Sequence, residues 1–156
     1  MTVQIDKIDR LLDWAASEQT KKDLGLPSEW DQSVWGRLDP VCGTACCIAG
    51  KAVLDNGAQM IFETWEGRRL AFSAHMAEGR MSIGGWASKL LGLDVYDSEE
   101  LFDSVNSLED LRRIRDNIAE EYGLPLRWRK PDAEMLIETT AEPVVEETKA
   151  DELQPV

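Results

Sequence analysis

Three cysteines and the single histidine are the residues of this sequence best suited to carry out chemistry. Cys42, Cys46 and Cys47 lie within six residues of one another. Cys42 stands just before a predicted helix N-terminus, where the helix dipole favours a thiolate and lowers the thiol pKa. Together with His75, it could form the Cys–His nucleophile pair of a hydrolase. The residues around it lack the local signatures of known thiol proteases.

The same four residues could instead supply the soft ligands of a metal site, with Cys42 and either Cys46 or Cys47 joined by His75. Adjacent cysteines on a helix point about 100° apart, so Cys46 and Cys47 cannot easily bind one ion. Cysteine is also among the most often buried residue types and fills small gaps in cores. We therefore expect the thiols to pack in the core, with no catalytic residue, cofactor or metal. The nucleophile and the metal site remain alternatives.

The element that positions these thiols is a predicted central helix of small and apolar residues. It is expected to begin at Gly43 or Thr44, whose hydroxyl can accept a hydrogen bond from a free backbone N–H. It is expected to end at Asn56-Gly57, two residue types that tolerate the left-handed conformation. Its small and apolar residues fall on two faces: Ala45, Ile48, Ala49 and Ala52 on one, and Cys47, Gly50 and Leu54 on the other. Such a helix is suited to the middle of the core.

The other elements are predicted from helical periodicity and turn signals, and they surround this helix. A connection rich in tryptophan, residues 28–41, is expected to wrap over the core. The predicted elements are helices at residues 3–18 and 83–91, a short helix beginning at Asp97-Ser98, a helix from the capping box Ser107–Asp110 to Gly123, and a β-hairpin of residues 60–65 and 70–75. The predicted fold is thus mainly α, a bundle of four to five short helices with one small hairpin.

The composition changes after Trp128. Residues 130–156 contain eight acidic side chains and only two lysines, and they contain no aromatic residue. Such a segment cannot bury enough apolar surface to offset the entropy of ordering it. We expect one globular domain over residues 1–129, followed by a disordered acidic tail.

The formal net charge of −13 limits the kinds of molecule that the protein is expected to bind. It argues against binding nucleic acid through a basic face, since that affinity comes from neutralising phosphates. Docking on anionic lipid is disfavoured for the same reason. No apolar run approaches the ~20 residues that span a bilayer, and the first residues do not resemble a secretory signal. Three cysteines within six residues do not make a disulfide framework, although a bond from Cys42 to Cys47 or Cys46 is geometrically possible. These features favour a cytoplasmic protein with reduced thiols.

One stretch resembles a known family. Trp35-Gly36, Cys42-Gly43-Thr44 and Cys47 with Ala49-Gly50 match a pattern found in small, functionally uncharacterised proteins of actinobacteriophages and actinomycetes. The downstream matches are Leu91-Gly92-Leu93, Leu101-Phe102 and the helix of residues 108–118. Many relatives carry an aromatic residue or histidine after Ala-Gly, where this chain has Lys51. The resemblance implies phage or prophage origin and a bacterial host cytoplasm, but no activity.

These features favour an acidic protein that binds a bacterial host protein with a basic surface. Trp30, Trp35 and Trp128 lie in irregular segments, and any of them left exposed would be a candidate interface anchor. An alternative is a DNA mimic, whose carboxylates imitate a phosphate array and inhibit a DNA-binding host enzyme. The other alternative is the Cys/His-based enzyme or metal-binding protein described above.

Overall fold

The computed structural model describes residues 2–41 and 43–129. The chain divides into two compact units, Met1–Pro125 and Leu126–Val156. All the helices and strands of the described residues lie in the first unit. The predicted acidic tail, residues 130–156, lies outside the described residues.

The first unit combines helices with an antiparallel sheet, so the prediction of a mainly α bundle with one hairpin is wrong. The strands are β1 (Gly36–Asp39), β2 (Gly43–Ala45), β3 (Gln59–Trp65), β4 (Arg68–Met76) and β5 (Gly79–Ser82). Their order is β2-β1-β4-β3, and β5 pairs with β4 beyond the end of β1. The sequence prediction missed β1, β2 and β5 because strands of three or four residues are too short to show periodicity.

The predicted hairpin is present as β3 and β4, the longest strand pair of the sheet. Its two-residue turn, Glu66-Gly67, has positive φ at both positions, 50° and 79°. That backbone conformation matches the right-handed twist of the flanking strands. Positive φ is strained for Glu66, the one described non-glycine residue that has it. The register shifts between Ile61 and Phe62, where Phe72 of β4 has no partner in β3, and such a bulge bends the strand that carries the extra residue, here β4.

The central helix α2 (Ile48–Asp55) is shorter than predicted. It begins after Cys47 rather than at Gly43 or Thr44, because residues 43–45 pair with β1 as β2. Its predicted end is confirmed, since Asn56 is the C-cap and Gly57 has φ of 82°. Small residues let this helix approach other backbones closely. A side chain at Gly50 would overlap the Trp35 carbonyl oxygen and the Cβ of Cys46.

The helices predicted from periodicity are present, with adjusted ends. They are α1 (Ile5–Asp23), α3 (Ile83–Leu91), α4 (Val95–Leu101) and α5 (Leu108–Glu121). Helix α4 begins earlier than predicted because Asp94, and not a later residue, is its N-cap and accepts from Asp97 N. The predicted capping box is confirmed at α5, where Ser107 and Asp110 each accept from the other's backbone N–H.

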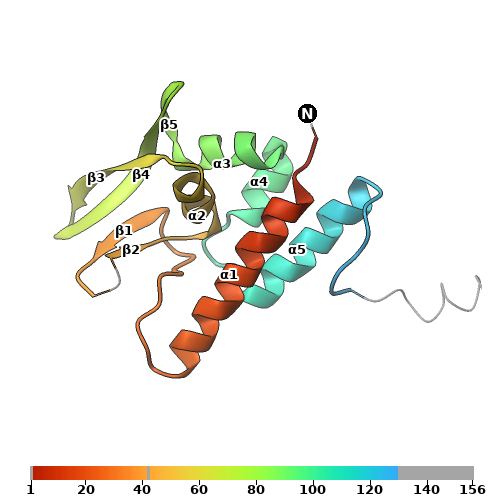
Figure 1. Ribbon diagram of the computed structural model, residues 1–156, viewed down its shortest axis with the longest axis horizontal. Helices are drawn as coiled ribbons and strands as arrows, with labels where there is room; N and C mark the ends of the chain where they lie inside the picture. The colour runs from red at the N-terminus through yellow and green to blue at the C-terminus, as the bar shows by residue number, and fades with distance from the viewer. Residues whose placement is uncertain (1, 42, 130–156) are drawn as a thin grey trace, which may run out of the picture. The chain divides into compact units, whose positions relative to one another are not determined.

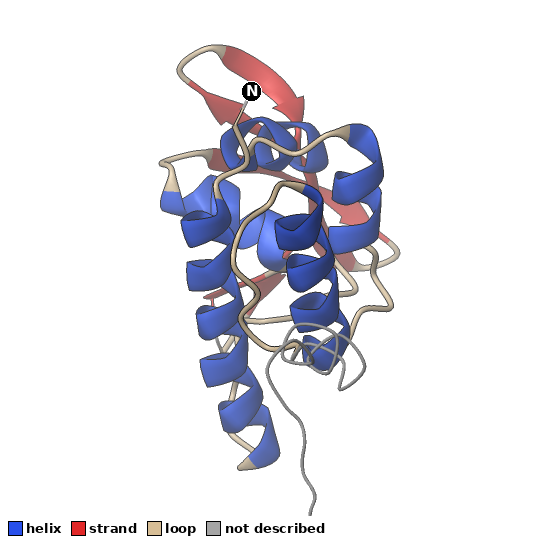
Figure 2. Ribbon diagram, turned by 90° about the vertical axis from the view of Figure 1, so that its right-hand side faces the viewer, coloured by secondary structure: helices blue, strands red, loops and turns tan. Residues whose placement is uncertain are grey.

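Helices α1 and α5 pack side by side, as Figures 1 and 2 both show, and in Figure 2 the strands lie behind and above them. Buried Arg115 on α5 connects them. Its Nε and Nη2 donate to the two carboxylate oxygens of Asp9 on α1 at 2.7 and 3.0 Å, and Nη1 donates to Asp116 and to the Pro125 carbonyl. Among the described residues, no helix combines the length and the apolar character needed to cross a membrane.

Gly50→Ala is expected to lower the free energy of unfolding by about 2–4 kcal/mol, because the added methyl group meets backbone that cannot move away. Urea denaturation followed by tryptophan fluorescence measures the change. The control is Asp55→Ala on the same helix, which removes only the surface ion pair with Lys51 and should cost less than about 0.5 kcal/mol. Equal stability of Gly50→Ala and the wild type would contradict the close contact.

Candidate functional site

The two described cysteines lie in the core. Cys46 and Cys47 are each 1% exposed. Burial raises the pKa of Cys47 to about 11 and raises that of Cys46 well above its usual range. A thiol that stays protonated near neutral pH is a poor nucleophile and a poor metal ligand. Cys42, the third candidate, lies outside the described residues.

His75 is a surface residue. It is exposed on β4, between Gln59 of β3 and Arg80 of β5 in the sheet register. Within residues 2–41 and 43–129, Cys46, Cys47 and His75 do not belong to a group of three side chains close enough to hold one metal ion. The described geometry therefore gives no support to the nucleophile or to the thiol metal site.

The tryptophans proposed as interface anchors have different surroundings. Trp30 is 3% exposed, and its Nε1 donates to Gln32 at 3.0 Å, so it is a core residue. Trp35 is half-buried at the surface. Trp128 is half-buried in the second unit, where the Arg127 guanidinium lies 4.4 Å from its ring centroid. Trp65, which the sequence prediction did not select, is 58% exposed.

Trp35 lies between two surface grooves. The first, of about 380 Å³, is mainly apolar and is lined by Trp35, Val95, Phe102 and the Gly84-Gly85 pair of α3, among others. The second, of about 400 Å³, runs from Trp35 over the sheet to Trp65 and Phe72. Because Trp35 lines both, the two grooves adjoin at this residue and present an aromatic side chain with apolar neighbours. Such a surface is suited to a partner's apolar side chains.

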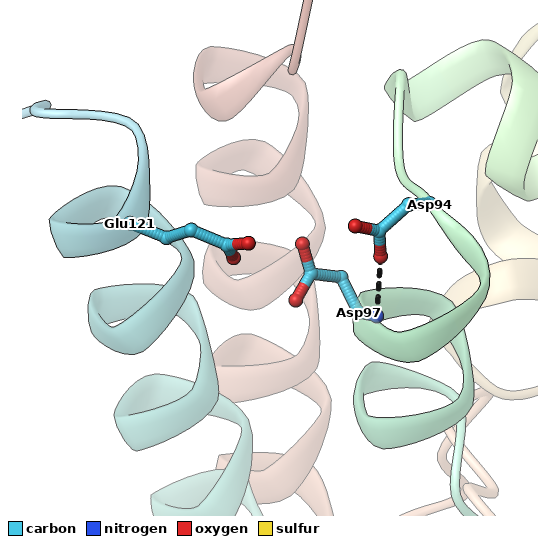
Figure 3. Close-up of side chains that lie close together, drawn as sticks. All are labelled: Asp94, Asp97 and Glu121. Atoms are coloured by element: carbon cyan, nitrogen blue, oxygen red, sulfur yellow. Dashed lines mark hydrogen bonds between the residues drawn. The ribbon is translucent and has the colours of Figure 1, made fainter.

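A second candidate is an acidic cluster, Asp94, Asp97 and Glu121, shown in Figure 3. Asp94 and Asp97 come from the start of α4, and Glu121 is the last residue of α5. One carboxylate oxygen from each lies within 4.8 Å of the others. Asp97 is only 8% exposed, whereas Asp94 and Glu121 are exposed.

Burial, followed by the negative charges of Glu121 and Asp94, raises the pKa of Asp97 to about 6. A carboxyl in such a position can hold a proton shared with its neighbour or bind a cation. Sequence reasoning missed this cluster because Glu121 is remote from Asp94 and Asp97 along the chain. The only local signal was the helix-capping pattern of Asp94 and Asp97, which is common and predicts no ligand.

Native Cys46 and Cys47 are expected to react with iodoacetamide at least about 100-fold more slowly than in the urea-unfolded protein, since reaction requires local opening and deprotonation. Peptide mass spectrometry measures the two residues separately. The unfolded chain serves as the control for intrinsic reactivity. Rapid labelling of Cys47 in the native protein would contradict its burial in the core.

Asp97→Asn is expected to stabilise the metal-free protein by about 1 kcal/mol near pH 7.5 and to have little effect near pH 4. The pKa of Asp97 is raised on folding, so its contribution to stability is complete below pH 3.8 and is lost as the pH rises through about 6. Thermal unfolding in EDTA at both pH values measures the difference.

The control for this experiment is Asp6→Asn, because Asp6 is exposed in the first turn of α1. It should change stability by less than about 0.5 kcal/mol at either pH. An equal effect of Asp97→Asn at the two pH values would show that Asp97 does not take up its proton in the folded state.

Comparison with known proteins found no matching family model, no matching curated protein and no matching solved structure. The two candidate sites are therefore interpreted from their own chemistry. The surface around Trp35 has the features of a protein interface, and the acidic cluster has those of a site for a proton or a cation.

Proposed function

We propose that this protein binds a bacterial protein through the Trp35 surface, defined as Trp35, Trp65, Phe72, Val95 and Phe102. The observation that carries the proposal is the position of Trp35 between two grooves on an otherwise strongly acidic molecule. Val95 is 67% exposed, Trp65 58% and Phe72 44%. Together they place more apolar surface in contact with water than scattered single residues would.

The packing around Trp35 holds its ring in place before any partner binds. The ring meets Phe102 edge-to-face, with centroids 6.2 Å apart. The six-membered ring of the indole also lies against Gly84, where a Cβ would lie 3.0 Å from it. Behind it, the Trp35 backbone lies against Gly50. An anchor that is already ordered loses little entropy on binding, which is a property of interface hot spots.

The charge distribution indicates the chemistry of the partner. Glu99 lines the first groove beside Val95, and exposed Glu100 follows it on α4. Arg68 lines the second groove. A matching partner presents apolar side chains to Trp35 and lysine or arginine residues over α4. The resemblance to actinobacteriophage proteins supports a bacterial host protein, met in the host cytoplasm, as this partner.

The test is capture of partners from actinobacterial lysate, followed by measurement of the dissociation constant with the purified partner. The variant Trp65→Ala/Val95→Ser removes two exposed side chains of the Trp35 surface without opening the core. It is expected to weaken binding at least about tenfold, equivalent to about 1.4 kcal/mol. Rising salt should slow association, since the partner's basic residues approach an acidic surface.

The matched control is Val105→Ser, because Val105 is 80% exposed and does not line either groove. It should bind like the wild type. Repeated capture of no defined protein, or equal binding by the double variant and the control, would contradict the proposal.

A further inference from the structure

We propose that Asp94, Asp97 and Glu121 form a binding site for a hard divalent cation, Ca²⁺ or Mg²⁺. The site joins the beginning of α4 to the end of α5, two helices that pack on each other. It is chemically unlike the thiol site considered from the sequence, since all its ligands are carboxylate oxygens.

The spacing of the carboxylates suits one ion. An oxygen from each of the three residues lies within 4.8 Å of the others, and Figure 3 shows the side chains turned toward one another. Oxygens bind Ca²⁺ at about 2.3–2.6 Å, so two ligands of one ion can be as far apart as about 5 Å. Three carboxylates would provide part of the coordination shell, and water would complete it.

The buried carboxylate of Asp97 distinguishes this cluster from acidic groups that are merely close together on a surface. Asp97 is 8% exposed, and its Oδ2 has no hydrogen-bond partner among the described residues. A buried carboxylate oxygen without a partner is costly, because its hydration is lost and nothing replaces it. A cation between Asp97 and its two neighbours would replace that hydration.

The surroundings also favour a cation. Oδ1 of Asp94 accepts from the Asp97 backbone N–H at 2.8 Å, which holds the Asp94 carboxylate beside Asp97. Glu121 stands at the C-terminal end of α5, where the helix dipole places partial negative charge. None of the ion pairs found among the described residues involves these three carboxylates. Buried Asp116 differs, since Arg115 neutralises it at 2.9 Å.

The test is thermal unfolding of the full chain after removal of metals with EDTA, near pH 7.5, with CaCl₂ or MgCl₂ at about 10 mM. The reference is KCl at equal ionic strength, which separates binding from general screening. With a dissociation constant of about 10⁻⁴–10⁻³ M, the melting temperature is expected to rise by about 5 °C. Terbium luminescence sensitised by Tyr96 and Tyr122, which adjoin the ligands in sequence, reports binding directly.

Asp97→Asn and Glu121→Gln should each abolish the rise in melting temperature and the luminescence. The matched control is Glu109→Gln, which removes an exposed charge at the other end of α5 and should keep both responses. The proposal is overturned if neither cation raises the melting temperature beyond KCl. It is also overturned if Asp97→Asn responds like the wild type, since the cation then binds elsewhere or the carboxylates share only a proton.

Discussion

The close approach of α2 to the segment before β1 is the constraint on which the rest of the structure depends. A side chain at Gly50 would overlap the Trp35 carbonyl oxygen, so only glycine allows this contact. The Cys47 N–H, at the start of α2, donates to the Val34 carbonyl at 2.9 Å and fixes the two segments together. The contact sets where β1 meets β4, and it holds the Trp35 ring against α3 between the two grooves.

The same packing explains why the thiols of Cys46 and Cys47 are expected to be unreactive. Cys46 and Cys47 connect β2 to α2 and are each 1% exposed, and their burial keeps them protonated. The helix dipole that could activate a cysteine at a helix start cannot overcome this desolvation, since burial is the larger effect on both. The two described cysteines therefore serve as core packing, and the two candidate sites are formed by carboxylates and by the surface around Trp35.

Two buried aspartates, Asp116 on α5 and Asp97 beside the end of α5, have different surroundings. Along the length of α5, Asp116 is fully buried and is neutralised by Arg115, which also holds Asp9 and joins α5 to α1. At the C-terminal end of α5, Glu121 meets Asp94 and Asp97 with no basic side chain paired to them among the described residues. In the first arrangement the buried carboxylate already has a cationic partner. The second costs stability unless a proton or cation is present, which is typical of sites kept for binding.

The sequence by itself determined the local elements whose signals are contained in a few neighbouring residues. The periodicity of α1, α3 and α5, the capping box at Ser107 and the turn between β3 and β4 could all be predicted, because their physics is local. Only the tertiary structure decided the sheet, since β1 pairs with β4 across more than thirty residues and is too short to show a pattern. It likewise decided that, of two candidate anchors, Trp30 is buried and Trp35 borders the grooves, because the exposure of each ring depends on residues remote in the sequence that pack against it. The acidic cluster was beyond prediction for the same reason: Glu121 reaches Asp97 only through the packing of α5 on α4.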